Sequence, residues 1–293
     1  MMSDSPQVLP DAKVSLRELA RMKRHGEKIA AVTAYDTPSA RLADLAGIDC
    51  VLVGDSAVMT LFGRPSTVSA TMDEMLLLTR GVVDGARHAF VIADMPFGSY
   101  QLSDLSAVEN AVRFIKEAGA DAVKLEGAGT SLSRVAAIVG AGIPVVGHIG
   151  LTPQTATMIG GLKAQGRTAE QAWKLCEDAL ALERAGCCAL VLEAVPECVA
   201  RRATDSLRIP TIGIGAGASC DGQILVWHDL LGLTEGRVPQ FVKSYADVRG
   251  AIVSALTSYV AEVRAAQFPE ARHTYAMPAS ERERFEDAVA KGG

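Results

Sequence analysis

Val51-Leu52-Val53-Gly54-Asp55-Ser56 is a short apolar run that ends in an acidic residue, and two later runs repeat this pattern. They are Val91-Ile92-Ala93-Asp94-Met95-Pro96 and Val123-Lys124-Leu125-Glu126-Gly127. Apolar runs of this length are typical of strands buried on both faces of a parallel sheet. A carboxylate at the carboxyl end of such a strand lies where α/β proteins bind ligands. The three acids therefore predict one site, and their oxygen ligands suit a divalent ion such as Mg²⁺.

Strand-like runs recur along the chain and alternate with helical patterns. They occur near residues 29–35, 50–55, 90–95, 122–126, 144–149, 188–193 and 210–214, with a weaker eighth near 224–227. Helix-start signatures occur at Ser15 with Glu18, Thr71 with Glu74, Ser106 with Glu109, and Thr168 with Gln171. This alternation indicates a parallel sheet with right-handed crossovers. Seven or eight units favour the α/β class and a (β/α)8 TIM barrel with an N-terminal helix and extra C-terminal helices, over a doubly wound open sheet.

The length of 293 residues fits a single large domain. We predict a flexible N-terminal arm over residues 1–13, one barrel domain over residues 14–275 and a polar C-terminal tail over residues 276–293. Both long connections that follow strands, residues 56–71 and 150–168, are expected to cover a ligand.

Composition and charge exclude several classes of protein. The net charge of −5 argues against a nucleic-acid-binding surface. No apolar run reaches the roughly 18 residues of a membrane span, and the first residues lack the layout of a signal peptide. The six cysteines form no C-x-x-C pair and are expected to be buried, reduced thiols. We therefore expect a cytoplasmic protein that binds neither nucleic acids nor membranes.

Further residues are expected to join the acids. Lys124 and Glu126 are two positions apart and so point the same way from their strand. A lysine facing a barrel interior needs anionic partners, which either a structural ion pair or a bound substrate would supply. His148 ends the fifth run, at the same end as the acids. Glu193 ends the sixth, where apolar neighbours suit a general base, with a salt bridge or helix cap as the structural alternative.

The seventh run ends in the glycine-rich stretch Gly213-Ile214-Gly215-Ala216-Gly217. Glycines at this point of a barrel bind phosphate through backbone N–H groups in many proteins. They also allow a substrate or a neighbouring loop to approach closely. The sequence leaves both interpretations open.

An ordered set of motifs runs through nearly the whole chain. It comprises Thr33-Ala34-Tyr35-Asp36, Val53-Gly54-Asp55-Ser56, Ala93-Asp94-Met95-Pro96-Phe97, Lys124-Leu125-Glu126-Gly127, Gly147-His148-Ile149-Gly150-Leu151-Thr152-Pro153-Gln154, Gly166-Arg167, Leu192-Glu193, Gly213-Ile214-Gly215-Ala216-Gly217 and Asp221-Gly222-Gln223. Over about residues 13–275 the chain closely resembles the ketopantoate hydroxymethyltransferase family. This resemblance implies a (β/α)8 barrel related to the phosphoenolpyruvate-mutase and isocitrate-lyase enzymes.

The resemblance also implies an activity and partners. The activity is transfer of a one-carbon unit from the co-substrate 5,10-methylenetetrahydrofolate to 3-methyl-2-oxobutanoate, through a Mg²⁺-stabilised enolate, to give 2-dehydropantoate, the first step of pantothenate biosynthesis. One Mg²⁺ per subunit and a homo-oligomer, commonly a decamer, are implied as well. The alternatives are a Mg²⁺-dependent 2-oxo-acid lyase or mutase of the same barrel superfamily, and a non-catalytic binding protein.

The matched motifs imply a role for each site residue. Asp55 and Asp94 would hold Mg²⁺ directly, and Glu126 would do so directly or through water. The keto acid would be bound by Asp55, Ser56, Asp94, Lys124 and His148. Glu193 would be the catalytic base.

Overall fold

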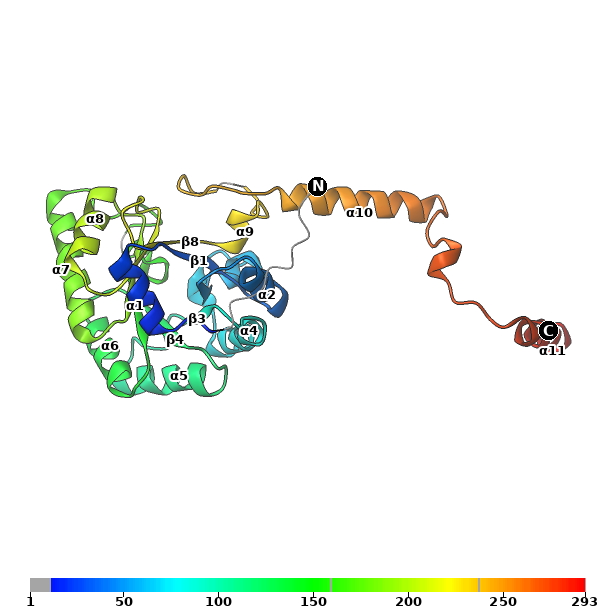
Figure 1. The fold of residues 1–293 in the computed structure, drawn as a ribbon, viewed down its shortest axis with the longest axis horizontal. Helices are drawn as coiled ribbons and strands as arrows, with labels where there is room; N and C mark the ends of the chain where they lie inside the picture. Colours follow the sequence, from blue (N-terminus) through cyan, green and yellow to red (C-terminus); the bar gives the residue numbers. More distant parts are fainter. Residues whose placement is uncertain (1–11, 159, 237, 293) are drawn as a thin grey trace. The chain divides into compact units, whose positions relative to one another are not determined.

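A computed structural model describes residues 12–158, 160–236 and 238–292 of the chain. Its parallel strands form a closed barrel in chain order, and β8 pairs with β1 (Figure 1). The strands are β1 (Ile29–Thr33), β2 (Cys50–Val53), β3 (Phe90–Asp94), β4 (Ala122–Glu126), β5 (Val145–Gly150), β6 (Ala189–Glu193), β7 (Thr211–Ile214) and β8 (Gly222–Leu225). The predicted TIM barrel is confirmed, and the closure between β1 and β8 excludes the open sheet.

Helices follow most strands. The α-helices are α1 (Leu16–His25), α2 (Thr37–Leu45), α3 (Ala57–Thr60), α4 (Met72–Gly85), α5 (Asp104–Lys116), α6 (Ser131–Gly140), α7 (Ala169–Ala185), α8 (Glu197–Ser206), α9 (Trp227–Leu230), α10 (Val248–Arg264) and α11 (Ala279–Gly292). Short 3₁₀ turns are η1 (Thr67–Ser69), η2 (Pro153–Thr155) and η3 (Ala271–His273). Among the described residues, no helix is long and apolar enough to cross a bilayer.

Most of the predicted helix starts are confirmed. Ser15, Thr71 and Thr168 each accept a hydrogen bond from the backbone N–H three residues later. The start predicted at Ser106 is wrong, because α5 begins after Ser103. Ser103 and Ser106 cap each other's backbone N–H groups in a reciprocal capping box, which starts the helix one turn earlier.

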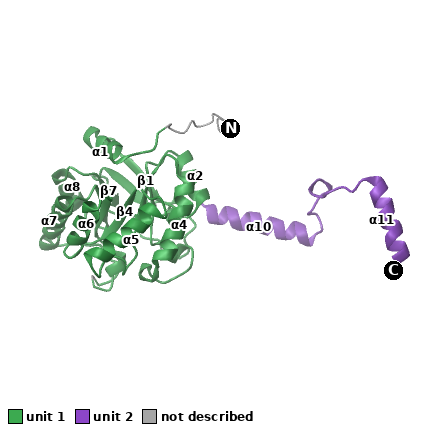
Figure 2. Cartoon of the chain, turned by 90° about the horizontal axis from the view of Figure 1, so that it is seen from below, with its two compact units in different colours: residues 1–245 green, residues 246–293 purple. Residues whose placement is uncertain are grey.

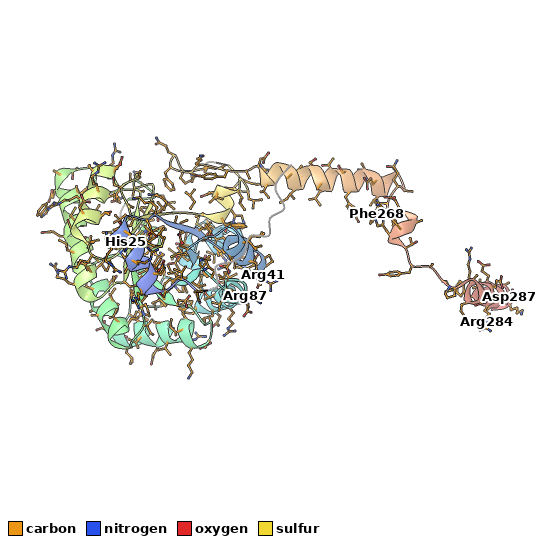
Figure 3. All side chains as sticks on the ribbon, viewed as in Figure 1. His25, Arg41, Arg87, Phe268, Arg284 and Asp287 are labelled. Carbon is orange, nitrogen blue, oxygen red and sulfur yellow. The ribbon has the colours of Figure 1, made fainter. Side chains whose placement is uncertain are left out.

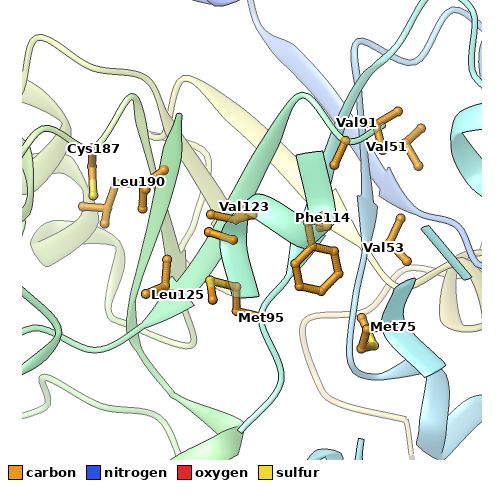
Figure 4. Packing of buried hydrophobic residues seen from close by; sticks show 14 of the residues in the cluster. Val51, Val53, Met75, Val91, Met95, Phe114, Val123, Leu125, Cys187 and Leu190 are labelled. Atoms are coloured by element: carbon orange, nitrogen blue, oxygen red, sulfur yellow. The ribbon is translucent and has the colours of Figure 1, made fainter. Parts of the chain in front are cut away.

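Apolar side chains fill both sides of the strands. Strand residues such as Val51, Val91 and Val123 pack outward against helix residues such as Phe114 of α5 (Figure 4). Alternate residues face the barrel interior and form a second cluster. Leu19 of α1 packs on that cluster at the first residues of the strands. The amino end of the barrel is therefore apolar, which leaves the carboxyl end for polar groups.

Two compact units divide the chain, one ending at Tyr245 and the other comprising residues 246–293 (Figure 2). The second unit holds α10, η3 and α11. The predicted polar tail contains α11, whose charged side chains include Arg284 and Asp287 (Figure 3). The predicted limit at residue 275 stays a prediction, because a compact unit does not establish what folds independently. The predicted arm lies almost wholly outside the described residues.

The cysteines are all free thiols. Cys50, Cys187 and Cys220 are buried, as predicted, and burial raises the pKa of each thiol. The prediction of a buried thiol is wrong for Cys198, which is exposed on α8. A position on the outer surface of a helix explains the difference.

Candidate active site

Strand register brings the predicted residues together at the carboxyl end of the barrel. Asp94 of β3 pairs laterally with Lys124 of β4. Glu126 of β4 pairs with His148 of β5. Asp94, Lys124 and His148 each lie two positions beyond an apolar residue of the interior cluster, and Glu126 lies two positions beyond Lys124. A polar layer therefore follows the apolar interior at the carboxyl end of the barrel.

Lys124 is the cation of this layer. Its Nζ lies 2.7 Å from Asp94 Oδ1, and the side chain is only 5% exposed. Burial opposes the charge, but the neighbouring carboxylates outweigh it and raise the pKa of Lys124. The expected anionic partner is thus a carboxylate of the protein, and the ammonium remains charged beside it.

We call Asp55, Asp94 and Glu126 the acid cluster. Asp55 follows β2, and its backbone N–H donates to Asp94 Oδ2 at 3.0 Å. Burial raises the pKa of Asp55 to about 8, and repulsion from Asp94 and Glu126 adds to the effect. Burial also raises the pKa of Asp94, although Lys124 opposes it. Burial and mutual repulsion therefore oppose full ionisation of the acid cluster, and a bound cation would favour the ionised form.

His148 connects Glu126 to Glu193. Its Nδ1 lies 3.4 Å from Glu126 Oε1, and its Nε2 lies 3.1 Å from Glu193 Oε2. Burial and the Lys124 charge oppose protonation, but the two glutamates outweigh them and raise the pKa of His148 to about 9. Nε2 lies within ion-pair distance of Glu193 Oε2 but does not make a hydrogen bond of good geometry with it. The other carboxylate oxygen of Glu193, Oε1, is left for another partner.

The acid cluster fits Mg²⁺ bound in part by water and substrate. In the part of the chain that the structure describes, no group of three or more His, Cys, Asp or Glu side chains is arranged so that it could by itself hold a metal ion. Mg²⁺ commonly uses one or two carboxylates and completes its octahedron with waters and substrate oxygens. Asp55 and Asp94 are 5% and 3% exposed and repel each other, which suits direct ligands. Glu126 is already held by His148, which suits contact through water.

Ser56 lies beside the acid cluster, across Gly54. A Cβ atom added at Gly54 would lie 2.8 Å from Ser56 Oγ and 3.6 Å from Asp94 Oδ2. A side chain at position 54 would therefore press on the Ser56 hydroxyl, which glycine avoids. Ser56 Oγ also lies 2.9 Å from the Tyr35 hydroxyl.

Gln154 and Tyr100 also belong to this layer, although the sequence patterns did not predict them. Gln154 is 4% exposed and donates from Nε2 to Asp55 Oδ2 at 2.9 Å. The Tyr100 hydroxyl donates to Gln154 Oε1 at 2.6 Å. The signals were the place of Gln154 just after a strand, in a connection predicted to cover the ligand, and its position at the end of the motif that begins at Gly147.

A cavity of about 1800 Å³ reaches Ser56 and Glu193 and extends along β1 to Ile29, and we call it the mouth cavity. Residues of both long connections also line it. Phe241 lines it too and explains one glycine of the seventh-strand stretch. A Cβ added at Gly215 would lie 2.6 Å from the Phe241 ring. Of the two interpretations of the glycine-rich stretch, this distance favours the second at Gly215, where the glycine lets the segment that carries Phe241 approach closely.

Comparisons with known proteins agree along the length of the chain. The family model described as ketopantoate hydroxymethyltransferase matches residues 13–271. A 3-methyl-2-oxobutanoate hydroxymethyltransferase of Moorella thermoacetica is 54% identical over 90% of this chain and 98% of its own. That of Carboxydothermus hydrogenoformans is 52% identical over 90% and 96%.

Solved structures show the same fold at low identity. Phosphonopyruvate hydrolase in complex with oxalate and Mg²⁺ is similar with a TM-score of 0.58 and 14% identity, over 94% of this chain and 96% of that one. The 2,3-dimethylmalate lyase of the PEP mutase/isocitrate lyase superfamily has a TM-score of 0.57 and 16% identity, over 97% and 100%.

Proposed function

The chain belongs to the ketopantoate hydroxymethyltransferase family, and we propose that it transfers a hydroxymethyl group from 5,10-methylenetetrahydrofolate to 3-methyl-2-oxobutanoate. The product is 2-dehydropantoate. Relatives of this name match about nine tenths of the chain. The observation that carries the proposal is the connection from Lys124 and the acid cluster through His148 to Glu193. It combines a cation site for a 2-oxo acid with a base.

The acid cluster would hold Mg²⁺, through Asp55 and Asp94 directly and through Glu126 by way of water. When bound, the ion would withdraw electrons from the keto and carboxylate oxygens of the substrate and so make its C3 hydrogen acidic. The solved Mg²⁺ and oxalate complex of a protein with this fold supports such a site by analogy. Oxygen ligands of this kind also accept Mn²⁺.

Lys124 stabilises negative charge on the substrate. Its ammonium is fixed by Asp94 and lies beneath the position that a keto acid would occupy on the acid cluster. A charged donor fixed in a buried site needs little rearrangement when charge develops, so it favours the transition state. Ser56 lines the mouth cavity and would hold the carboxylate of the same substrate.

Glu193 is the proposed base. Its side chain is 16% exposed and lines the mouth cavity, so a substrate can reach it. Because Oε2 faces His148, Oε1 would take the C3 proton. Carbon 3 then bonds to the one-carbon unit of the folate, which approaches through the mouth cavity. The one-carbon unit bridges two folate nitrogens, so two C–N bonds break as it bonds to carbon 3 and to the oxygen of a water molecule. Each nitrogen leaves with the electron pair of its bond and takes a proton, one that came from C3 through Glu193 and one from the water.

The decisive experiment incubates the purified protein with Mg²⁺ and 3-methyl-2-oxobutanoate, with and without 5,10-methylenetetrahydrofolate. Mass spectrometry should detect 2-dehydropantoate only when the folate is present. A Mg²⁺-dependent lyase or mutase, which the low-identity structural relatives suggest, would instead act on a 2-oxo acid or its adduct without folate. Folate-independent turnover would therefore overturn the transferase assignment.

Assembly and location rest on the family resemblance alone. We propose a homodecamer in the cytoplasm, since both are expected for the family. Light scattering after size-exclusion chromatography would measure the mass of the assembly against the 30.8 kDa of one chain.

A further inference from the structure

We propose that Gln154 is a positioning residue which, together with Tyr100, orients Asp55 and Glu126 for the metal ion. The proposal rests on the metal role that the proposed function gives to these acids. It concerns a neutral side chain in the connection after β5, which touches the acid cluster without belonging to it.

Gln154 makes four hydrogen bonds in one buried place. Its Nε2 donates to Asp55 Oδ2 and to the Met95 carbonyl oxygen, both at 2.9 Å. Its backbone N–H donates to Glu126 Oε2 at 3.0 Å. Its Oε1 accepts from the Tyr100 hydroxyl at 2.6 Å. One residue thus connects the segment after β5 to the ends of β2, β3 and β4.

The partners allow only one orientation of the Gln154 amide. The Met95 carbonyl oxygen can only accept, so the group that faces it has to be the NH₂, and the same NH₂ faces Asp55 Oδ2. The Tyr100 oxygen already accepts the Glu126 backbone N–H at 3.2 Å. Its own proton is therefore free to point at Gln154 Oε1. Rotating the amide by half a turn would place Oε1 against the Met95 carbonyl oxygen, two acceptors facing each other, so the network favours the orientation that is observed.

This orientation decides which carboxylate oxygens remain for a cation. Gln154 occupies Oδ2 of Asp55 and leaves Oδ1 available. Its backbone N–H occupies Oε2 of Glu126, whose Oε1 faces His148. A neutral amide does this without adding a positive charge that would compete with the metal. Asp94 is held differently, by the Lys124 ammonium.

A purely structural role is the competing explanation, in which Gln154 only fixes the 150–168 connection to the barrel. Losing its bonds would then cost stability, because Asp55 and Met95 would each keep a buried acceptor without its donor. Metal affinity separates the two explanations. Partners that orient metal ligands typically change affinity about 10- to 100-fold when they are removed.

The experiment measures binding of Mg²⁺ alone by calorimetry, and thermal unfolding in parallel, on the full chain. Gln154→Leu keeps similar bulk and removes the amide, and we expect an affinity weaker by about 10- to 100-fold. Tyr100→Phe should weaken affinity by a smaller factor. The double variant should bind close to Gln154→Leu, because Tyr100 acts largely through Gln154.

The matched control is Thr211→Val at the amino end of β7. Thr211 is fully buried, and its hydroxyl bonds Thr204 and Asp221 far from the acid cluster. It should lose stability and keep normal Mg²⁺ affinity. If Gln154→Leu behaves in the same way, the proposal is overturned while the metal site stands. If Gln154→Leu does not fold, normal affinity in Tyr100→Phe overturns it. A wild-type protein that binds no Mg²⁺ removes the metal role itself and the proposal with it.

Discussion

The Tyr35 hydroxyl lies 2.9 Å from the Ser56 hydroxyl and joins it to a buried series of donors. The Trp227 backbone N–H donates to Thr33 Oγ1 at 2.9 Å, and the Thr33 hydroxyl donates to Tyr35 at 2.9 Å. Because Tyr35 already accepts from Thr33, its own proton can point at Ser56 Oγ. With Tyr35 as the donor of this contact, the Ser56 proton is free for an oxygen of the keto acid.

Tyr35→Phe should therefore weaken keto-acid binding by misdirecting Ser56. One such hydrogen bond contributes about 1 kcal/mol, which corresponds to a roughly 5-fold higher KM with kcat little changed. Steady-state kinetics on Tyr35→Phe, Ser56→Ala and the double variant test this. If Tyr35 acts through Ser56, the double variant matches Ser56→Ala. Effects that simply add would disprove the series.

Glu193→Gln should slow exchange of the C3 hydrogen of 3-methyl-2-oxobutanoate by about 10²- to 10⁴-fold, because an amide cannot take the proton. The amide keeps an oxygen beside His148, so keto-acid binding should be nearly normal. Nuclear magnetic resonance in D₂O measures exchange without folate, and calorimetry measures binding. Exchange at the wild-type rate would remove Glu193 as the base.

Affinity for Mg²⁺ should depend on pH because of Asp55. Burial and the neighbouring acids raise its pKa to about 8 when no cation is bound, so below this pH Mg²⁺ has to displace a proton. Affinity should rise up to about tenfold per pH unit below pH 8 and level off above it. Calorimetry in buffers of different ionisation enthalpy would count the released protons. Equal affinity at about pH 6.5 and pH 8.5 would contradict this account.

The raised pKa of Asp55 also predicts how the free energy of unfolding changes with pH when a chelator keeps Mg²⁺ away from the protein. The unfolded chain ionises Asp55 near pH 3.9, whereas the folded chain holds the proton to about pH 8. The Asp55 contribution to stability is therefore complete below about pH 4 and decreases as the pH rises through 8. Added Mg²⁺ should restore the melting temperature most at high pH. If added Mg²⁺ raised the melting temperature by the same amount at every pH, Asp55 would not be the group that links stability to pH.

The barrel could be predicted from the sequence because strand-like runs and helical patterns alternate along the chain, and each strand-like run shows the same apolar pattern. Each of Asp94, Glu126 and Glu193 ends an apolar run. Its position at the end of its own strand can therefore be predicted without knowing which strands are neighbours in the barrel. The contact between His148 and Glu193 needed the register, which no local pattern encodes. That register follows from closure of the barrel, and closure depends on all the strands together.

Gln154 could not be predicted because its partners are far away in the sequence. Asp55 is 99 positions before it and Met95 is 59 positions before it. Nothing in the Thr152-Pro153-Gln154 segment distinguishes a buried glutamine from an exposed one. The Ser103 cap of α5 was missed for a local reason, since Ser-x-x-Ser is a weaker signature than Ser-x-x-Glu.

Two helical glycines should respond to alanine with opposite signs. At Gly85 of α4 a Cβ would lie 2.5 Å from the Thr37 carbonyl oxygen and 2.8 Å from Ala40 Cβ, both on α2. The helices would have to separate there, so Gly85→Ala should cost about 1–3 kcal/mol. At Gly140 of α6 a Cβ meets no atom within 4 Å. Gly140→Ala should instead gain up to about 1 kcal/mol from helix propensity.

Chemical denaturation of both variants measures these changes in the free energy of unfolding. Because the substitution is identical, effects on the unfolded chain are nearly the same and the difference reports packing. A Gly85→Ala variant as stable as wild type would mean that α2 and α4 can move apart freely. That result would conflict with the way Ala40 and Met75 pack in one buried cluster between these helices and the barrel. Since α2 and α4 follow β1 and β2, a shift there would also reach Tyr35 and Ser56. The KM of Gly85→Ala should therefore rise together with its loss of stability, whereas Gly140→Ala should keep a normal KM.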